Sequence, residues 1–324
     1  MKVILPGGSG QIGTSLARHF QVQGHEVVVL SRKPRPAPWR VRYWDIRQLG
    51  DWAGEFDGAD VVINLAGYTV NCRYTDVNCG RIMDSRTIST RLVGEAIAAA
   101  SRPPRIWLQS STATIYAHRY DAPNDEITGI LGGDEPDAPD TWRFSIAVAR
   151  AWEKACHDAV TPRTRKVLMR SAMTMTPDPG GIFATLLGLV RKGLGGTCGD
   201  GRQYVSWIHE RDFLRAVEWL IAREALTGPV NLASPLPLPN ADFMRVLRQA
   251  WGTRIGLPAT KWMLEIGARV LKTETELILK SRRVVPTRLL ESGFQFELPN
   301  WPAAAEDLCE QRRARRLSTQ VNCG

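Results

Sequence analysis

Apolar residues in the first half of the chain recur in short continuous runs, and longer amphipathic segments separate these runs. Runs rich in Val, Ile and Leu are typical of strands that are buried on both faces of a parallel sheet. They lie at residues 2–5, 26–30, 60–65, 105–109 and 166–169. Helix-length segments lie between them at residues 11–23, 82–100 and 146–159. This alternation predicts an α/β fold with a Rossmann-type doubly wound parallel sheet.

The pattern changes after about Ser171, where glycines crowd a stretch that we interpret as loops. A helix at residues 212–221, a strand at 229–233 and a helical portion from 241 to about 290 follow. We therefore expect three parts. A Rossmann domain covers residues 1–175 with returning segments near 204–234, a smaller and mainly helical substrate lobe covers 176–203 and 235–300, and a basic C-terminal tail covers 301–324.

Composition and charge narrow the class of protein. The 324 residues are 44% hydrophobic and 23% charged, as in ordinary globular proteins. No apolar run approaches the ~20 residues of a membrane helix, and no signal peptide is recognised, so we expect a cytoplasmic protein without a membrane partner. The six cysteines form no CxxC pair, which argues against a metal site.

The net charge of +9 does not by itself indicate a nucleic-acid partner. Aromatic and basic residues do not interleave along one stretch, and no helix-turn-helix or finger pattern appears. Part of the charge could instead serve an anionic substrate or cofactor. We expect a small-molecule substrate, and the sequence leaves open whether the chain is a monomer or a homodimer.

A glycine-rich loop follows the first predicted strand and opens the first helix, with the spacing G-x-x-G-x-x-G. Its first glycine allows a tight turn, its second lets the backbone approach a pyrophosphate, and its third allows close packing of helix on sheet. The free N–H groups of the helix N-terminus would bind the phosphates. The predicted dinucleotide-binding residues of this loop are Gly7, Ser9, Gly10, Gln11, Ile12 and Gly13. The alternative is an ordinary strand-helix turn.

The end of the second predicted strand indicates which dinucleotide binds. An acidic residue there would accept a hydrogen bond from the ribose 2′-hydroxyl of NAD, but this chain has Ser31 and Arg32. A hydroxyl and a guanidinium can bind a 2′-phosphate, which a carboxylate would repel. These two residues favour NADP(H), although Arg32 could also be an ordinary surface residue at a strand end.

Several motifs in the same order resemble the extended and atypical short-chain dehydrogenase/reductases, which are NAD-dependent epimerase/dehydratase-like proteins. Within these, the chain resembles the epimerase-family proteins that carry an extra C-terminal domain of unknown function. Besides the glycine loop and residues 31–34, the motifs lie at residues 64–67, 84–86, 152–153, 206–209 with 212, 228–231, and 285–286 with 293–294.

The resemblance implies further cofactor contacts. Leu65, Ala66 and Gly67 match the turn whose backbone passes the adenosine ribose and the pyrophosphate. Arg86 matches an arginine that reaches the cofactor, and Thr174 matches a position whose backbone lines the nicotinamide end. Arg86 could also be a solvated helix residue, but it shares a helix face with Ile82 and Val93, which favours the cofactor contact.

The resemblance also implies a catalytic set, and here the chain departs from the family pattern. Thr112 takes the place of the hydroxyl that binds the substrate oxygen. The Tyr and the Lys that normally follow are missing, because Ser145 and Ala149 occupy their positions. Tyr116, which could face the pocket, is a candidate substitute, and a structural tyrosine is the other interpretation.

Other titratable residues are weaker candidates for catalysis. Glu126 and Asp140 precede the helix that holds Ser145, and either could act as an acid or a base. His209 resembles a structural turn of the family, so we expect a hydrogen-bonded structural histidine.

We expect an NADP(H)-binding oxidoreductase or epimerase-like enzyme. It would transfer hydride on a small carbonyl, alcohol or nucleotide-sugar substrate. The alternative is a non-enzymatic NADPH-binding regulatory or redox-sensing protein, which the missing Tyr-Lys pair would favour.

Overall fold

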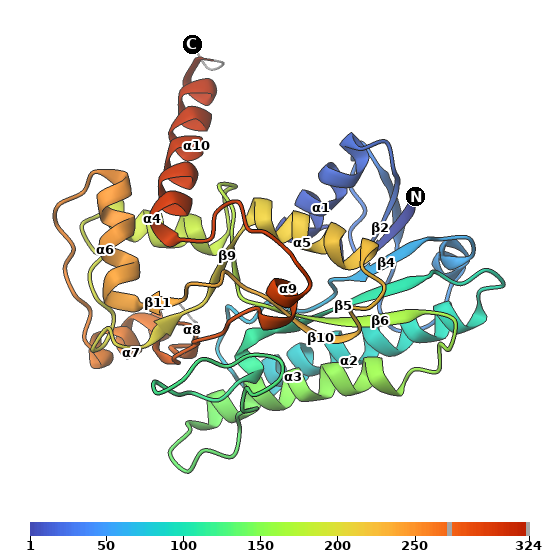
Figure 1. Cartoon of the computed structure of the whole chain (residues 1–324), viewed down its shortest axis with the longest axis horizontal. Helices are drawn as coiled ribbons and strands as arrows, with labels where there is room; N and C mark the ends of the chain where they lie inside the picture. Colours follow the sequence, from blue (N-terminus) through green and yellow to red (C-terminus); the bar gives the residue numbers. More distant parts are fainter. Residues whose placement is uncertain (271–273, 322–324) are drawn as a thin grey trace.

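A computed structural model describes residues 1–270 and 274–321 (Figure 1). Its centre is a seven-stranded parallel sheet in the order β10-β6-β5-β4-β1-β2-β3. The strands are β1 (Lys2–Pro6), β2 (Glu26–Ser31), β3 (Arg40–Tyr43), β4 (Val61–Asn64), β5 (Ile106–Thr112), β6 (Arg165–Ser171) and β10 (Gly228–Leu232). The predicted Rossmann-type α/β fold is confirmed, and β3 is a strand that the apolar pattern missed because most of its residues are exposed.

Helices cover both faces of this sheet. Successive residues of a strand point to opposite faces, and in β1 Val3 and Leu5 contact α1 (Gln11–Val22) and α5 (Glu210–Ala222), whereas Ile4 faces the other side. That other side is covered by α2 (Asp76–Ala99) and α3 (Asp140–Asp158), which contribute Leu92 and Cys156 to the core. The continuous apolar runs therefore reflect burial on both faces.

Two of these helices begin earlier than the apolar pattern predicts. We expected helices from residues 82 and 146, but α2 begins at Asp76 and α3 at Asp140. The first turns of α2 are polar, and the Thr75 side chain caps the helix by accepting a hydrogen bond from the backbone N–H of Asn78. An apolar pattern does not register a capped polar turn, so the start of α2 was missed.

A second core holds the smaller lobe together. It joins α4 (Ile182–Arg191), α6 (Asn240–Trp251) and α10 (Trp301–Val321), and the rings of Phe243 and Trp301 stack 4.0 Å apart. Helix α4 lies within the glycine-rich stretch that we interpreted as loops. The remaining helices and strands are short, or border the cleft between the lobes: η1 (Asp51–Phe56), η2 (Ala113–Ile115), β7 (Met173–Met175), β8 (Tyr204–Val205), β9 (Trp207–His209), β11 (Leu238–Pro239), α7 (Lys261–Val270), α8 (Glu276–Leu279) and α9 (Thr287–Glu291).

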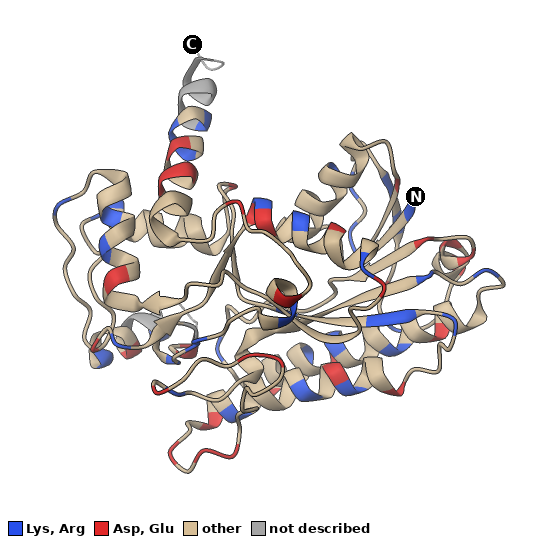
Figure 2. Cartoon of the chain, viewed as in Figure 1, with Lys and Arg blue, Asp and Glu red and all other residues tan. Residues whose placement is uncertain are grey.

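The segment that we expected to be a basic tail is a packed helix over its first half. In α10, Trp301, Ala305 and Leu308 are buried, because apolar residues recur there at helical spacing and face α6. The basic run follows on the same helix, where acidic and basic residues mix (Figure 2). Residues 322–324 of the expected tail lie outside the described residues. No helix among the described residues is both long and apolar enough to span a membrane.

Candidate functional site

The glycine loop lies where β1 meets α1, beside the carboxyl end of β4. Gly7 has a positive φ of 74°, and a Cβ there would lie 2.6 Å from the Cα of Ala66. A Cβ on Gly13 would lie 2.4 Å from the backbone of Gly8. Only glycine fits at these two positions, so the chain folds here into a tight turn with a closely packed helix.

Gly10 is different, because nothing lies within 4 Å of the place where its Cβ would be. It is the N-cap of α1, no side chain caps this helix, and its first turn has no acidic residue. The free N–H groups at this helix end therefore face open space that suits an anion. Ile12, in contrast, packs against the core on the face of the sheet that α1 and α5 cover.

Two serines connect the glycine loop to the end of β2. The buried Ser31 donates a hydrogen bond from its Oγ to Oγ of Ser9 over 3.1 Å, and accepts one from the backbone N–H of Lys33. Arg32, which follows Ser31 in the sequence, is exposed. The predicted 2′-phosphate residues thus lie next to the predicted pyrophosphate loop, as one dinucleotide requires.

The turn after β4 completes this edge. The backbone N–H of Leu65 donates to the carbonyl of Pro6, and a Cβ on Gly67 would approach the guanidinium carbon of Arg86 to 3.2 Å. Arg86 is not the solvated helix residue of the alternative interpretation. It donates to the carbonyls of Tyr68 and Ile82, and burial lowers its pKa to about 10.

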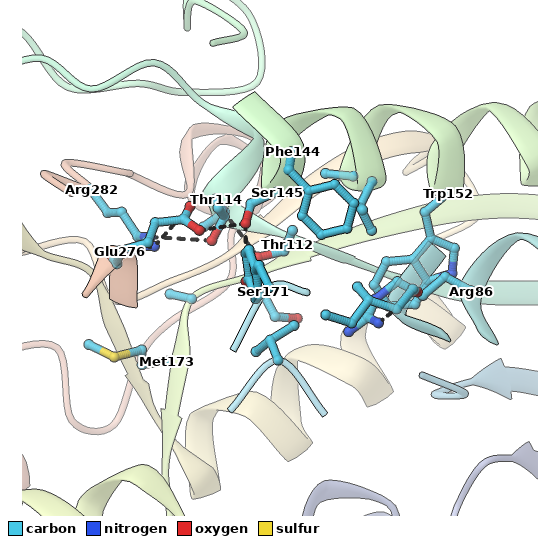
Figure 3. Close-up of a pocket in the computed structure, with 17 residues that line it drawn as sticks. Arg86, Thr112, Thr114, Phe144, Ser145, Trp152, Ser171, Met173, Glu276 and Arg282 are labelled. Carbon is cyan, nitrogen blue, oxygen red and sulfur yellow. Dashed lines mark hydrogen bonds and ion pairs between the residues drawn. The ribbon is translucent and has the colours of Figure 1, made fainter. Parts of the chain in front are cut away.

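A cavity of about 210 Å³ opens between this edge and the smaller lobe (Figure 3). Arg86 lies at one end with its guanidinium over the ring of Trp152, 4.9 Å from the ring centre. Apolar side chains form much of the wall, and polar ones cluster at the end away from Arg86 (Figure 3). The residues of the wall are Val70, Tyr74, Ile82, Arg86, Thr112, Ala113, Thr114, Phe144, Ser145, Val148, Ala149, Trp152, Ser171, Ala172, Met173, Glu276 and Arg282.

The cavity contains the first predicted catalytic residue. Thr112 ends β5 and lines the cavity, and its Oγ1 accepts a hydrogen bond from the backbone N–H of Thr114 over 3.1 Å. Ser145 and Ala149 of α3, which occupy the places of the missing Tyr and Lys, line the same cavity. Thr174 lies in β7 one residue beyond Met173, which lines the cavity, and Gln11 donates to Oγ1 of Thr176 nearby.

Tyr116, the second candidate, is not at the cavity. Its ring is buried, and its hydroxyl donates to Oδ1 of Asn231 and accepts from Arg170, both over 3.0 Å. Arg170 in turn forms a two-point ion pair with Glu153 of α3. Ser111 of β5 also donates to Glu153, so this network binds β5, β6, β10 and α3 together. It gives Tyr116 a structural role away from the cavity, in place of the catalytic role that we expected.

Two of the other acid-base candidates, Glu126 and His209, have structural roles. Both carboxyl oxygens of Glu126 accept backbone N–H groups, from Asn231 and Arg288. His209 caps α5 through Nδ1 and contacts Asp307 of α10 through Nε2, as expected of a structural histidine. Asp140 begins α3 and is exposed.

Sequence reasoning missed the acidic side of the cavity, which comes from a segment more than a hundred residues further along the chain. Residues 274–282 pass beside α3 and η2 and bring Glu276 and Arg282 into the wall. Glu276 is buried, and its Oε2 accepts a hydrogen bond from Ser145. Its Oε1 has no hydrogen-bond partner among the described residues and lies 3.7 Å from Arg282.

The electrostatics of this corner follow from burial. Burial raises the pKa of the Glu276 carboxyl, and the nearby charge of Arg282 and the Ser145 hydrogen bond oppose that shift. Burial also lowers the pKa of Lys280 to about 8, where its Nζ donates to the carbonyl of Thr114. Tyr74 lies 3.2 Å from Oγ of Ser145, and burial raises its pKa to about 12.

A family model for the NAD-dependent epimerase/dehydratase family matches residues 3–233, which include the whole glycine loop, Thr112 and Ser145. The chain belongs to this family. A second model, for a domain of unknown function known as DUF1731, matches residues 259–308, and these residues include Glu276 and Arg282. The predicted family and its additional C-terminal domain are thereby confirmed.

Relatives match nearly the whole chain. The human epimerase family protein SDR39U1 is 29% identical over 311 residues, covering 95% of this chain and 99% of its own. An epimerase family protein of Mycobacterium bovis is 31% identical over 302 residues, covering 91% and 93%. A crystal structure of human SDR39U1 with NADPH has a TM-score of 0.82 at 28% identity, covering 96% of this chain and 99% of that one.

Proposed function

We propose that this protein is an NADP(H)-dependent oxidoreductase or epimerase-like enzyme that acts on a small carbonyl, alcohol or nucleotide-sugar substrate. The observation that carries the proposal is the position of the cavity. It lies at the carboxyl ends of β5 and β6, and its Arg86 end borders the turn after β4 at Gly67. Enzymes of this architecture bind cofactor and substrate side by side at this edge of the sheet.

The residues of the loop fit a dinucleotide. The uncapped end of α1 at Gly10 offers N–H groups and free space to a pyrophosphate. Ser31 and Arg32 at the end of β2 would bind the 2′-phosphate of NADP(H), and Ser9 would be shared between the two. The crystal structure of the human relative with NADPH supports the choice of this cofactor. When bound, the nicotinamide supplies or accepts a hydride at its C4.

The chain's own residues would bind and orient the substrate. Thr112 would hold the reacting oxygen, because its side chain lines the cavity at the carboxyl end of β5. Phe144, Val148 and Trp152 provide an apolar wall that excludes water from one side. Arg86, held over Trp152, would keep a positive charge at the cofactor end.

Turnover of NADPH tests the proposal. NADPH oxidation would be followed with a panel of aldehydes, ketones, quinones and nucleotide sugars, alongside a fluorescence titration of NADPH binding. We expect slow turnover of at least one carbonyl, and Thr112→Val should lower it by about 100-fold while NADPH affinity stays the same. Thr112→Ser, which keeps the hydroxyl, is the matched control. Tight NADPH binding without any turnover would favour a regulatory or redox-sensing protein.

A further inference from the structure

One corner of the cavity brings Tyr74, Ser145 and Glu276 together, close to the positions where the Tyr-Lys pair is missing. Three side chains from distant parts of the chain meet there, as the dashed lines in Figure 3 show in part. Resting on the proposed function, we propose that Glu276 and Ser145 form the proton-transfer pair of this enzyme, with Tyr74 as a residue that positions Ser145.

Ser145 lies at the centre of this arrangement. Its Oγ donates to Oε2 of Glu276 on one side and lies 3.2 Å from the Tyr74 hydroxyl on the other. It occupies the sequence position of the missing tyrosine, and like Thr112 it lines the cavity. A substrate oxygen held by Thr112 would therefore meet the Ser145 hydroxyl from the same side of the cavity.

Glu276, in the cavity wall, has one oxygen without a hydrogen bond among the described residues. Its Oε1 is buried, makes no hydrogen bond among the described residues and is paired with Arg282 only over 3.7 Å. A carboxylate satisfied so weakly on one side is costly, which favours the protonated carboxyl. Ser145 fixes the other oxygen. A carboxyl held in this way by a hydroxyl relay can store the proton that the reaction needs.

The neighbours of Glu276 keep its proton available. The charged and titratable groups that surround it are Arg282, Lys280, Glu274 and Tyr74. Glu274 is itself engaged, since its carboxylate accepts from Arg73 and from the backbone N–H of Tyr74. Burial favours the neutral carboxyl, while Arg282 at 3.7 Å stabilises the carboxylate that remains after the proton has left.

The proton transfer balances in both directions. For reduction of a carbonyl, the Ser145 hydroxyl would turn from Oε2 of Glu276 to the substrate oxygen. Its O–H bond then breaks as an O–H bond forms on the substrate oxygen, and a proton carried on Oε2 of Glu276 passes to Oγ of Ser145. The bound reduced nicotinamide would supply the hydride for the carbonyl carbon, and the positive charge left on its ring would balance the new Glu276 carboxylate. Oxidation of an alcohol reverses each bond change, with the Glu276 carboxylate as the final base.

Infrared difference spectroscopy tests the proton store without any substrate. At neutral pH the NADPH-bound wild type should show a protonated carboxyl band that is lost in Glu276→Gln and displaced in Ser145→Ala. Glu126→Gln is the matched control, because burial also raises the pKa of this carboxyl, but its oxygens accept the backbone N–H groups of Asn231 and Arg288 outside the cavity wall. It should leave the Glu276 band in place. A spectrum without a band that depends on Glu276 would overturn the proposal.

Kinetics test the transfer itself, with the carbonyl that the wild type reduces fastest. Glu276→Gln and Ser145→Ala should each lower kcat by at least about 100-fold with NADPH affinity unchanged, and Ser145→Thr should restore most of it. Tyr74→Phe should lower kcat by about tenfold and displace the pH profile, which a purely structural loss would not do. If both main variants kept wild-type kcat, the proposal would be wrong. If the wild type reduced no carbonyl, the proposed function would fail, and the infrared band alone would decide whether Glu276 stores a proton.

Discussion

The two ends of the proposed binding cleft, the glycine loop and the corner around Ser145, are built in different ways. The glycine-loop end is made of backbone from one short stretch, in which Gly7 and Gly13 allow contacts that a side chain would prevent. The opposite end is made of side chains from the turn before α2, from α3 and from α8, and Tyr74, Ser145 and Glu276 meet only after the chain has folded. A backbone-built site depends on local pattern, whereas a side-chain-built site depends on long-range packing.

The largest expected effect breaks the backbone-built end. Gly10→Val should lower NADPH affinity by at least about 100-fold, because the new side chain would fill the space that a pyrophosphate needs. The protein itself should stay folded, since nothing lies within 4 Å of the new Cβ. A fluorescence titration and circular dichroism of the same sample measure both effects.

Gly7→Ala is the matched comparison for that experiment. Its Cβ would lie 2.6 Å from Ala66 and its φ of 74° disfavours any side chain, so thermal stability should fall along with NADPH binding. Unchanged NADPH affinity in a folded Gly10→Val protein would show that the dinucleotide does not bind at this loop.

The next effect concerns the choice between the two dinucleotides. Arg32→Ala should remove most of the preference for NADPH over NADH, a change of about ten- to a hundredfold in relative affinity, because a charge-assisted phosphate contact is lost. Lys33→Ala, one residue further along the same exposed strand end, is the control and should have a smaller effect. Equal affinity of the wild type for both dinucleotides would contradict the assignment.

The difference between the backbone-built and the side-chain-built end also explains which parts of the molecule the sequence could predict. The apolar runs predicted the buried strands, and the glycine spacing predicted the turn that the structure has at Gly7 and Gly13. The sequence could also place Ser145 at the position of the missing tyrosine, since that required only counting along one helix. It could not show that Glu276 reaches Ser145, because the two are 131 residues apart and no local pattern links them.

Tyr116 shows the opposite error. A tyrosine just after the strand that ends at Thr112 looks like a catalytic candidate in sequence, but a buried Arg170 binds its hydroxyl away from the cavity. Burial raises the pKa of this phenol, and Arg170 and Asn231 partly oppose the shift. One clue was present, since the Trp152-Glu153 motif places on α3 a carboxylate that such an arginine needs.

Tyr116→Phe separates structure from catalysis at this position. It should lower the free energy of unfolding by about 1–3 kcal/mol, because the buried Asn231 amide oxygen loses its donor. NADPH affinity should not change, and neither should turnover of any substrate that the wild type reduces. Chemical denaturation and steady-state kinetics measure the two quantities. A loss of kcat without a loss of stability would return Tyr116 to the list of catalytic residues.

The smallest expected effect is a change in how steeply the free energy of unfolding varies with pH. It tests the side-chain-built end through stability alone. The pKa of Glu276 is raised in the folded protein above its ordinary value of 4.5. Between these two values the unfolded chain has lost the proton that the folded chain still holds, so the free energy of unfolding should fall as pH rises. One group contributes at most about 1.4 kcal/mol per pH unit to this slope. The measurement should stay below the pKa of about 8 of Lys280, because loss of that buried charge begins to stabilise the fold at higher pH.

Glu276→Gln should flatten the slope. Ser145→Ala should instead extend it to higher pH, because the hydrogen bond that lowers the carboxyl pKa is removed. Denaturation midpoints across this pH range for the three proteins would measure the difference, and parallel curves would show that Glu276 titrates in the folded protein as it does in the unfolded chain.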